Sequence, residues 1–162
     1  MMDVDAQIGL KSCNADWNAV QRAVLGGWLL EGGAVSSQSR GVLDLTPLQN
    51  LPLRGGFLLI EARLTARPLL DPIERAATAE TLIRGRKFFV SLRADLDERE
   101  LSISLYHEVL EAATVGSDCP PDPLPDFNEG DFERAARAAH ERWGNASAST
   151  LNLLLAEFGF LD

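Results

Sequence analysis

The sequence predicts an α+β fold, with strands in the first half of the chain and helices in the last third. FLLIEARLTA at 57–66 begins as a continuous apolar run and then alternates, and KFFVSLRADL at 87–96 alternates around Phe89. Both patterns are typical of strands with a buried face. Because the strands and the final helices are separated along the chain, we expect a small mixed or antiparallel sheet with helices collected on one side.

Three helices are predicted after the second strand. The first follows a cap at Asp95 or Asp97, carries acidic residues in its first turn and ends at Gly116. The second covers 131–143 and stops at the following glycine, and the third lies within 147–160, where a serine precedes a leucine-rich body. These caps and stops place helices in the C-terminal half.

Local patterns also predict the conformation of the remaining segments. Helical spacing of apolar residues predicts a helix over 15–31, and the next ten residues, 32–41, are typical of a loop. VLDLT at 42–46 is a candidate strand, and 68–84 is expected to contain a helix that ends at Gly85. The proline-rich stretch 117–130 is expected to be a loop.

Composition limits the classes of function. The chain has 162 residues, which predicts one domain, and a net charge of −9 from 24 acidic and 15 basic residues. This charge argues against a nucleic-acid surface and against docking on an anionic membrane, since both need basic patches. The first residues lack the pattern of a signal peptide, and no run approaches the roughly 20 apolar residues of a membrane span. We therefore expect a cytoplasmic location.

The chemistry-bearing motif lies in the first of the three predicted helices. It reads His107-Glu108-Val109-Leu110-Glu111, an HExxE sequence inside an apolar run. On a helix, His107 and Glu111 share one face, and both are acceptable zinc ligands. In HExxH motifs the glutamate after the first histidine is the general base for a metal-bound water, which assigns that role to Glu108. The alternative is that the three polar residues form a solvent-exposed stripe.

The segment FFVSLRADLDERELSISLYHEVLEA resembles the core of the zincin-like metallopeptidases, and more narrowly the small gluzincins of the ImmA/IrrE-like type. In that family an edge strand lies along the substrate, a short acidic connection follows, and a helix supplies two metal ligands and the base. The resemblance implies that 90–92 is this strand and 96–100 the connection. Glu111 replaces the second histidine of the family motif, and Leu110 stands where smaller families often have glycine.

Such families take a third ligand from a later helix, and two candidates lie in 131–143. Glu133 and His140 are seven residues apart and share a helical face. Glu133 begins a sequence that resembles the family's E-x-x-A segment, whereas His140 would complete a His2Glu set. The alternative for each is an ordinary residue of an Arg- and Glu-rich helix.

The resemblance covers residues 86–143, and we expect a single zincin-like domain over 1–162. The local patterns predict an N-terminal helix and strands in 1–85 and a C-terminal helix in 144–162, and the resemblance implies a metal-site core in 86–143. We expect zinc or another divalent metal, and hydrolysis of peptide or amide bonds in a protein or peptide substrate. The alternative is a degenerate, non-catalytic zincin that binds a protein partner.

Overall fold

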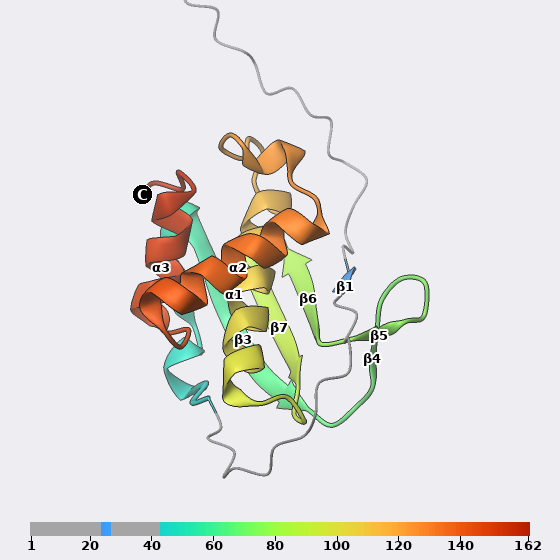
Figure 1. The fold of residues 1–162 in the computed structure, drawn as a ribbon. Helices are drawn as coiled ribbons and strands as arrows, with labels where there is room; N and C mark the ends of the chain where they lie inside the picture. Colours follow the sequence, from blue (N-terminus) through green and yellow to red (C-terminus); the bar gives the residue numbers. More distant parts are fainter. Residues whose placement is uncertain (1–23, 27–42) are drawn as a thin grey trace, which may run out of the picture.

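A five-stranded sheet with three helices on one face forms the body of the protein (Figure 1). The computed structural model describes residues 43–162, and it describes the backbone alone of residues 24–26. The α+β class is therefore confirmed for this part of the chain. The regular elements are β1 (Val24–Gly26), β2 (Leu51–Leu53), β3 (Phe57–Thr65), β4 (Leu69–Leu70), β5 (Ala76–Ala77), β6 (Ala79–Arg84), β7 (Lys87–Arg93), α1 (Glu98–Val115), α2 (Glu129–Trp143) and α3 (Ala148–Glu157).

The sheet has the strand order β1-β6-β7-β3-β2. The central pair β3 and β7 is parallel, and every other neighbouring pair is antiparallel. β6 and β7 form a hairpin whose two-residue turn contains Gly85 at φ 61°. A glycine suits this turn because other residues rarely adopt positive φ. The mixed sheet agrees with the sequence prediction, but β7 pairs on both sides and is not the edge strand expected for 90–92.

Two predictions in the first half are wrong where the structure describes them. The segment 68–84, expected to contain a helix, forms β4, β5 and β6 instead. Alanine and glutamate favour helices, but β6 pairs with β7 along its whole length and buries Ala79 and Thr81 on one face, so tertiary pairing overrides local propensity. Of the candidate strand 42–46, the described residues 43–45 are irregular and lead into a short 3-10 helix, Thr46–Leu48.

The helix predicted over 15–31 lies largely outside the described residues. Within it, the structure describes Val24–Gly26 as strand β1, which contradicts a continuous helix there. The backbone of β1 pairs with β6, so the long-range contact decides the conformation of these residues. The loop expected over 32–41 also falls outside the described residues.

The predicted C-terminal helices are confirmed. Asp97 caps α1 by accepting a hydrogen bond from the Glu100 amide, and Gly116 ends the helix. α3 begins after Ser147, whose side chain accepts from the Thr150 amide. The loop over 117–130 is confirmed up to Asn128, with a short 3-10 helix at Leu124–Asp126, but α2 begins at Glu129, two residues earlier than expected.

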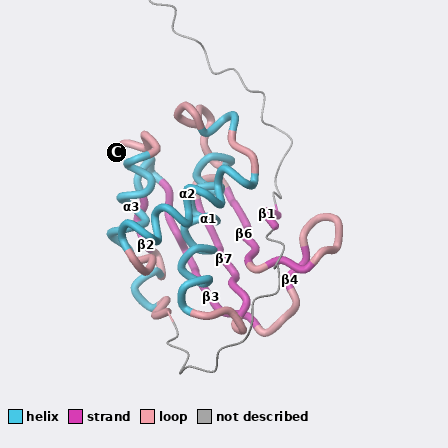
Figure 2. Tube along the Cα trace, viewed as in Figure 1, coloured by secondary structure: helices cyan, strands magenta, loops and turns pink. Residues whose placement is uncertain are grey.

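Helix α1 is buried on all sides over most of its length. It packs on β6 and β7 with one side, and on α2 and α3 with others (Figure 2). Every residue from 101 through 113 is consequently buried, including the polar ones. The solvent-exposed stripe considered for the motif is therefore ruled out. Among the described residues, no helix is long and apolar enough to cross a membrane.

Candidate metal centre

The motif on α1 lies in the interior of the protein. His107 is 1% exposed, Glu108 0% and Glu111 7%. Ionisable groups are expensive to bury unless they are paired or bind a metal. The partners of these three groups therefore decide what the site can do.

His107 and Glu111 contact each other as their helical spacing requires. His107 Nε2 lies 3.2 Å from Glu111 Oε2, one turn further along α1. A third group comes from the first turn of α2, where Glu129 Oε2 lies 3.4 Å from the same nitrogen. The three ligand atoms lie within 4.8 Å of one another. Ligands about 2.1 Å from a tetrahedral zinc are separated by about 3.4 Å, so His107, Glu111 and Glu129 could hold such an ion.

Helix α2 brings Glu129 to this position through its N-terminal cap. Asn128 accepts a hydrogen bond from the Asp131 amide, and the Asp131 side chain accepts from the Asn128 amide. This reciprocal capping box fixes the first turn, in which Glu129 is the first residue. Phe132, on the same turn, is buried with its ring centroid 6.0 Å from that of His107. The cluster therefore has an apolar wall on the α2 side, while the Glu129 side chain is 62% exposed.

Glu108 points to a different partner, on the sheet. Its Oε2 accepts a hydrogen bond of 2.6 Å from the hydroxyl of Thr81, on β6. Its other oxygen, Oε1, is buried and has no hydrogen-bond partner among the described residues. Thr81 thus orients the carboxyl group and leaves one oxygen available for chemistry.

The burial of the cluster changes how its groups titrate. Burial raises the pKa of Glu108 to about 8, although the nearby His107 and the Thr81 hydroxyl act in the opposite direction. Burial alone would lower the pKa of His107, but hydrogen bonds to Glu111 and Glu129 and the charge of Glu108 raise it to about 9. The pKa of Glu111 is also raised, chiefly by burial. Without a metal, the cluster therefore holds protons near neutral pH.

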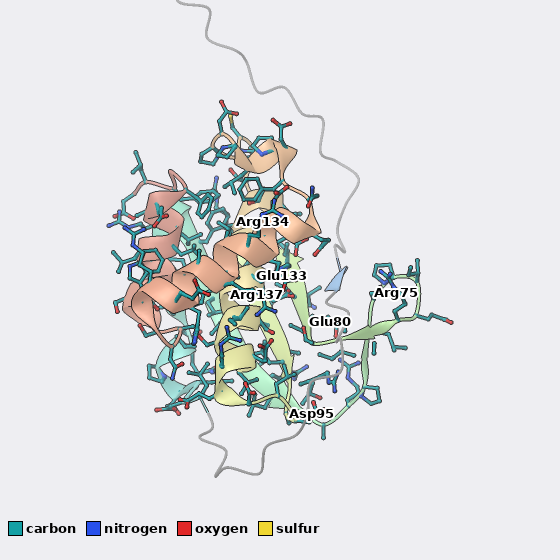
Figure 3. All side chains as sticks on the ribbon, viewed as in Figure 1. Arg75, Glu80, Asp95, Glu133, Arg134 and Arg137 are labelled. Atoms are coloured by element: carbon teal, nitrogen blue, oxygen red, sulfur yellow. The ribbon has the colours of Figure 1, made fainter. Side chains whose placement is uncertain are left out.

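The structure does not bring Glu133 or His140 into this cluster. Glu133 Oε1 accepts a hydrogen bond of 2.7 Å from Arg137 Nε, one turn along α2 (Figure 3). His140 Nδ1 lies 3.1 Å from the hydroxyl of Ser102, which also accepts from the Ala146 amide. Within 24–26 and 43–162, the structure has one group of three metal-ligating side chains, and neither residue belongs to it.

The sequence does not predict two residues of the site. Glu129 lies in the stretch 117–130 expected to be a loop, although Asn128 followed three residues later by Asp131 is a capping pattern that indicates the earlier helix start. Thr81 lies in a segment expected to be helical, and nothing in the local sequence indicates its contact with Glu108. The hydroxyl of Tyr106, beside the motif, donates to the Gly144 carbonyl and so joins α1 to the end of α2.

Comparisons with known proteins do not assign the chain to a family. No protein-family model, no curated protein and no solved structure matches it.

Proposed function

We propose that the protein is a metal-dependent hydrolase of peptide or amide bonds. In this proposal His107, Glu111 and Glu129 bind one divalent ion, with zinc as the first candidate, and Glu108 is the general base. The observation that carries the proposal is the meeting of two buried side chains of α1, His107 and Glu111, with the Glu129 carboxylate from another helix at ligand distances.

A divalent cation would account for the charges in the cluster. Two of its members are carboxylates, and a third carboxyl group, that of Glu108, lies on the next residue after His107. Negative charges at this spacing repel each other, most strongly where they are buried, as at Glu111. One divalent ion would balance Glu111 and Glu129 and would bind His107 in its neutral form.

Glu108 has the properties of a general base in such a centre. A base is most effective when its pKa is close to the working pH. Burial raises the pKa of Glu108 to about 8 in the metal-free protein, and a bound cation would lower it from there. The Thr81 hydroxyl holds Oε2, so Oε1 is the atom that would accept a proton from the attacking water. The ion would supply the Lewis acid that polarises the carbonyl and makes the water more acidic.

The decisive experiment combines metal analysis with two substitutions. Protein purified without a metal-affinity tag should contain about one equivalent of zinc or another divalent ion, and His107→Ala should lose it. Glu108→Gln should retain the metal and lose hydrolysis of peptide substrates, because an amide cannot accept the proton. Glu133→Gln is a matched control on α2, outside the cluster, and should keep both metal and activity. Hydrolysis by Glu108→Gln would remove Glu108 as the base.

A second candidate is a degenerate zincin that binds a protein partner without catalysis. The nearly complete burial of His107 and Glu108 favours this reading, because a substrate cannot reach the base unless something moves. In that case the metal would only hold α1 and α2 together. Protein that binds zinc, melts at a higher temperature with zinc, and cleaves no peptide would support this candidate.

A further inference from the structure

The helices α1, α2 and α3 lie on one face of the sheet, and the structure describes no helix on the opposite, rear face (Figure 1). Successive side chains of a strand point to opposite faces. On β7, Phe88, Val90 and Leu92 are buried in the core beneath the helices, so Phe89 and Ser91 belong to the rear face. Alternate residues of β3, β6 and β7 therefore form this face.

Four large apolar side chains of the rear face form a row across the three middle strands, named here the apolar row. Leu58 and Ile60 come from β3, Phe89 from β7, and Leu82, the cross-strand partner of Phe89, from β6. The bulge in β3 leaves Ile60 and Glu61 both outside the core. All four apolar residues are partly buried without packing against the core, whereas every other large apolar side chain that is partly buried in the described part of the chain does pack against it. Because a sheet face that meets only water is normally polar, the row indicates a surface that another molecule covers.

Basic side chains, named here the basic flanks, border the apolar row on both sides. Arg84 and Lys87 are cross-strand partners, two residues along their strands from the row, and both are exposed. The Cζ atom of Arg84 lies over the Phe89 ring, 5.6 Å from its centroid. On the other side of the row, Arg63 is exposed, and its Nε donates a hydrogen bond of 3.1 Å to the Ser91 hydroxyl. The row thus lies between cationic groups.

The charge of the sheet is opposite to the net charge of the chain. Residues 54–93 contain eight basic and four acidic residues, whereas 94–162 contain four basic and fifteen acidic ones. The acidic residues of the rear face, Glu61 and Glu80, each form an ion pair with an arginine. A partner of the rear face is therefore expected to be acidic, although the protein as a whole is acidic too.

The dimensions of the apolar row match those of a helix. The row crosses three strands, and two strand spacings of about 4.8 Å give a span of about 10 Å. Residues i and i+7 of an α-helix are about 10.5 Å apart along its axis, so the positions i, i+3, i+4 and i+7 would cover the row. Acidic residues beside that stripe would meet the basic flanks. A single nucleic-acid strand fits less well, because it needs several aromatic side chains for stacking and the row contains one.

We propose that the rear face binds an amphipathic helix of a partner protein, whose apolar stripe covers the apolar row and whose acidic residues face the basic flanks. Thr81 and Glu108 of the candidate centre lie on the helical side of the sheet, so the inference is independent of the proposed hydrolase.

The test measures the binding of a defined acidic helix to the full chain. The probe is a fluorescein-labelled peptide of about 18 leucine and glutamate residues, with leucine at i, i+3, i+4 and i+7, held helical by a staple on its acidic face. The wild type should bind it saturably by fluorescence anisotropy, and more weakly as salt is added. Arg84→Glu with Lys87→Glu should weaken binding at least tenfold. Arg134→Glu with Arg142→Glu, which makes the same change of charge on α2, should leave binding within twofold of the wild type.

A second variant tests the apolar row without changing any charge. Phe89→Ser should weaken binding at least tenfold, whereas Leu153→Ser, at an exposed apolar residue of α3, should have no effect. Circular dichroism checks that each variant is folded.

Four results would overturn the inference. The first is no binding by the wild type, which is also expected if the chain itself covers the row. The second is equal binding by the wild type and the variants of the rear face. The third is binding of a labelled oligothymidylate but not of the peptide, which would make the partner a nucleic acid. The fourth is a dimer in ultracentrifugation that Arg84→Glu with Lys87→Glu disperses, which would make the partner a second copy of the chain.

Discussion

Raising the pH should destabilise the metal-free protein, because buried groups of the cluster hold protons that the unfolded chain would release. The pKa of Glu108 is raised from 4.5 to about 8 by burial. The pKa of His107 is raised from 6.5 to about 9 because Glu111, Glu129 and the charge of Glu108 outweigh the opposing effect of burial. Both groups have higher pKa values in the folded protein than in the unfolded chain. At a pH between the two pKa values of a group, the folded protein therefore binds more protons. The stability present at low pH is lost as the pH rises through 8 and 9.

The magnitude follows from the number of protons that differ between the two states. A group that is protonated only in the folded state changes the free energy of unfolding by about 1.4 kcal/mol per pH unit. In a chain of this length, 1 kcal/mol shifts the melting temperature by about 2–4 °C. Over the pH range in which a group is protonated only in the folded state, it should therefore lower the melting temperature by about 3–6 °C per pH unit. The fall is steepest between pH 6.5 and 8, where Glu108 and His107 both contribute.

The assay is thermal unfolding from pH 5 to 9, with chelator and with excess zinc. Glu108→Gln should flatten the profile of the metal-free protein, because an amide does not titrate, whereas Glu133→Gln should leave it unchanged. The stabilisation by zinc should grow with pH, since the ligands bind in their deprotonated forms. A melting temperature that is constant or rises between pH 6 and 8.5 without metal would refute the reasoning. An unchanged profile in Glu108→Gln would refute it as well.

Three further predictions concern individual contacts. Thr81→Val should lower the free energy of unfolding by about 1–3 kcal/mol in urea denaturation at pH 6, since it leaves the Glu108 carboxyl without its hydrogen bond. In a protein that already carries Glu108→Leu, the same substitution should cost less, and an equal loss would show that the hydrogen bond to Glu108 is not the reason. Glu129→Ala should weaken zinc binding at least tenfold by competition titration. It should lower the melting temperature of the metal-free protein only slightly, because it removes a contact that raises the pKa of His107 but its own side chain is 62% exposed. Glu133→Ala is the control, and the opposite ranking in zinc binding would make Glu133 the third ligand. Ser102→Ala should lower the free energy of unfolding by about 1–3 kcal/mol, because the buried Ala146 amide loses its hydrogen-bond acceptor and His140 loses its contact. Its zinc content should match that of the wild type, and loss of zinc would contradict the position of Ser102 and His140 outside the metal cluster.

The sequence predicted the elements whose signals are local. The cap at Asp97 and the stop at Gly116 bound α1 because both act through hydrogen bonds and backbone conformation within one turn. The approach of His107 to Glu111 follows from helical spacing alone. The strand over 57–66 was found because its apolar pattern is strong, and the structure has it as β3.

The parts that the sequence did not predict depend on contacts distant along the chain. β6 has a helix-favouring composition, and it becomes a strand because the Gly85 turn lets it pair with β7. The hydrogen bond from Thr81 to Glu108 spans 27 residues, so no local pattern indicates it. The expected edge strand at 90–92 failed for the same reason, since β7 pairs with its hairpin partner β6 on one side and with β3, more than 20 residues earlier in the chain, on the other.

The three candidate ligands come from two different helices, and this would affect how fast a bound ion could leave. His107 and Glu111 are embedded in α1, whereas Glu129 belongs to the first turn of α2 and is largely exposed. Helix ends open far more often than whole proteins unfold. If that turn loosens, the centre loses one ligand while the fold persists. The residence time of a bound ion would then measure the opening of a single helical turn, and weakening the Asn128 cap should shorten it without changing the other two ligands.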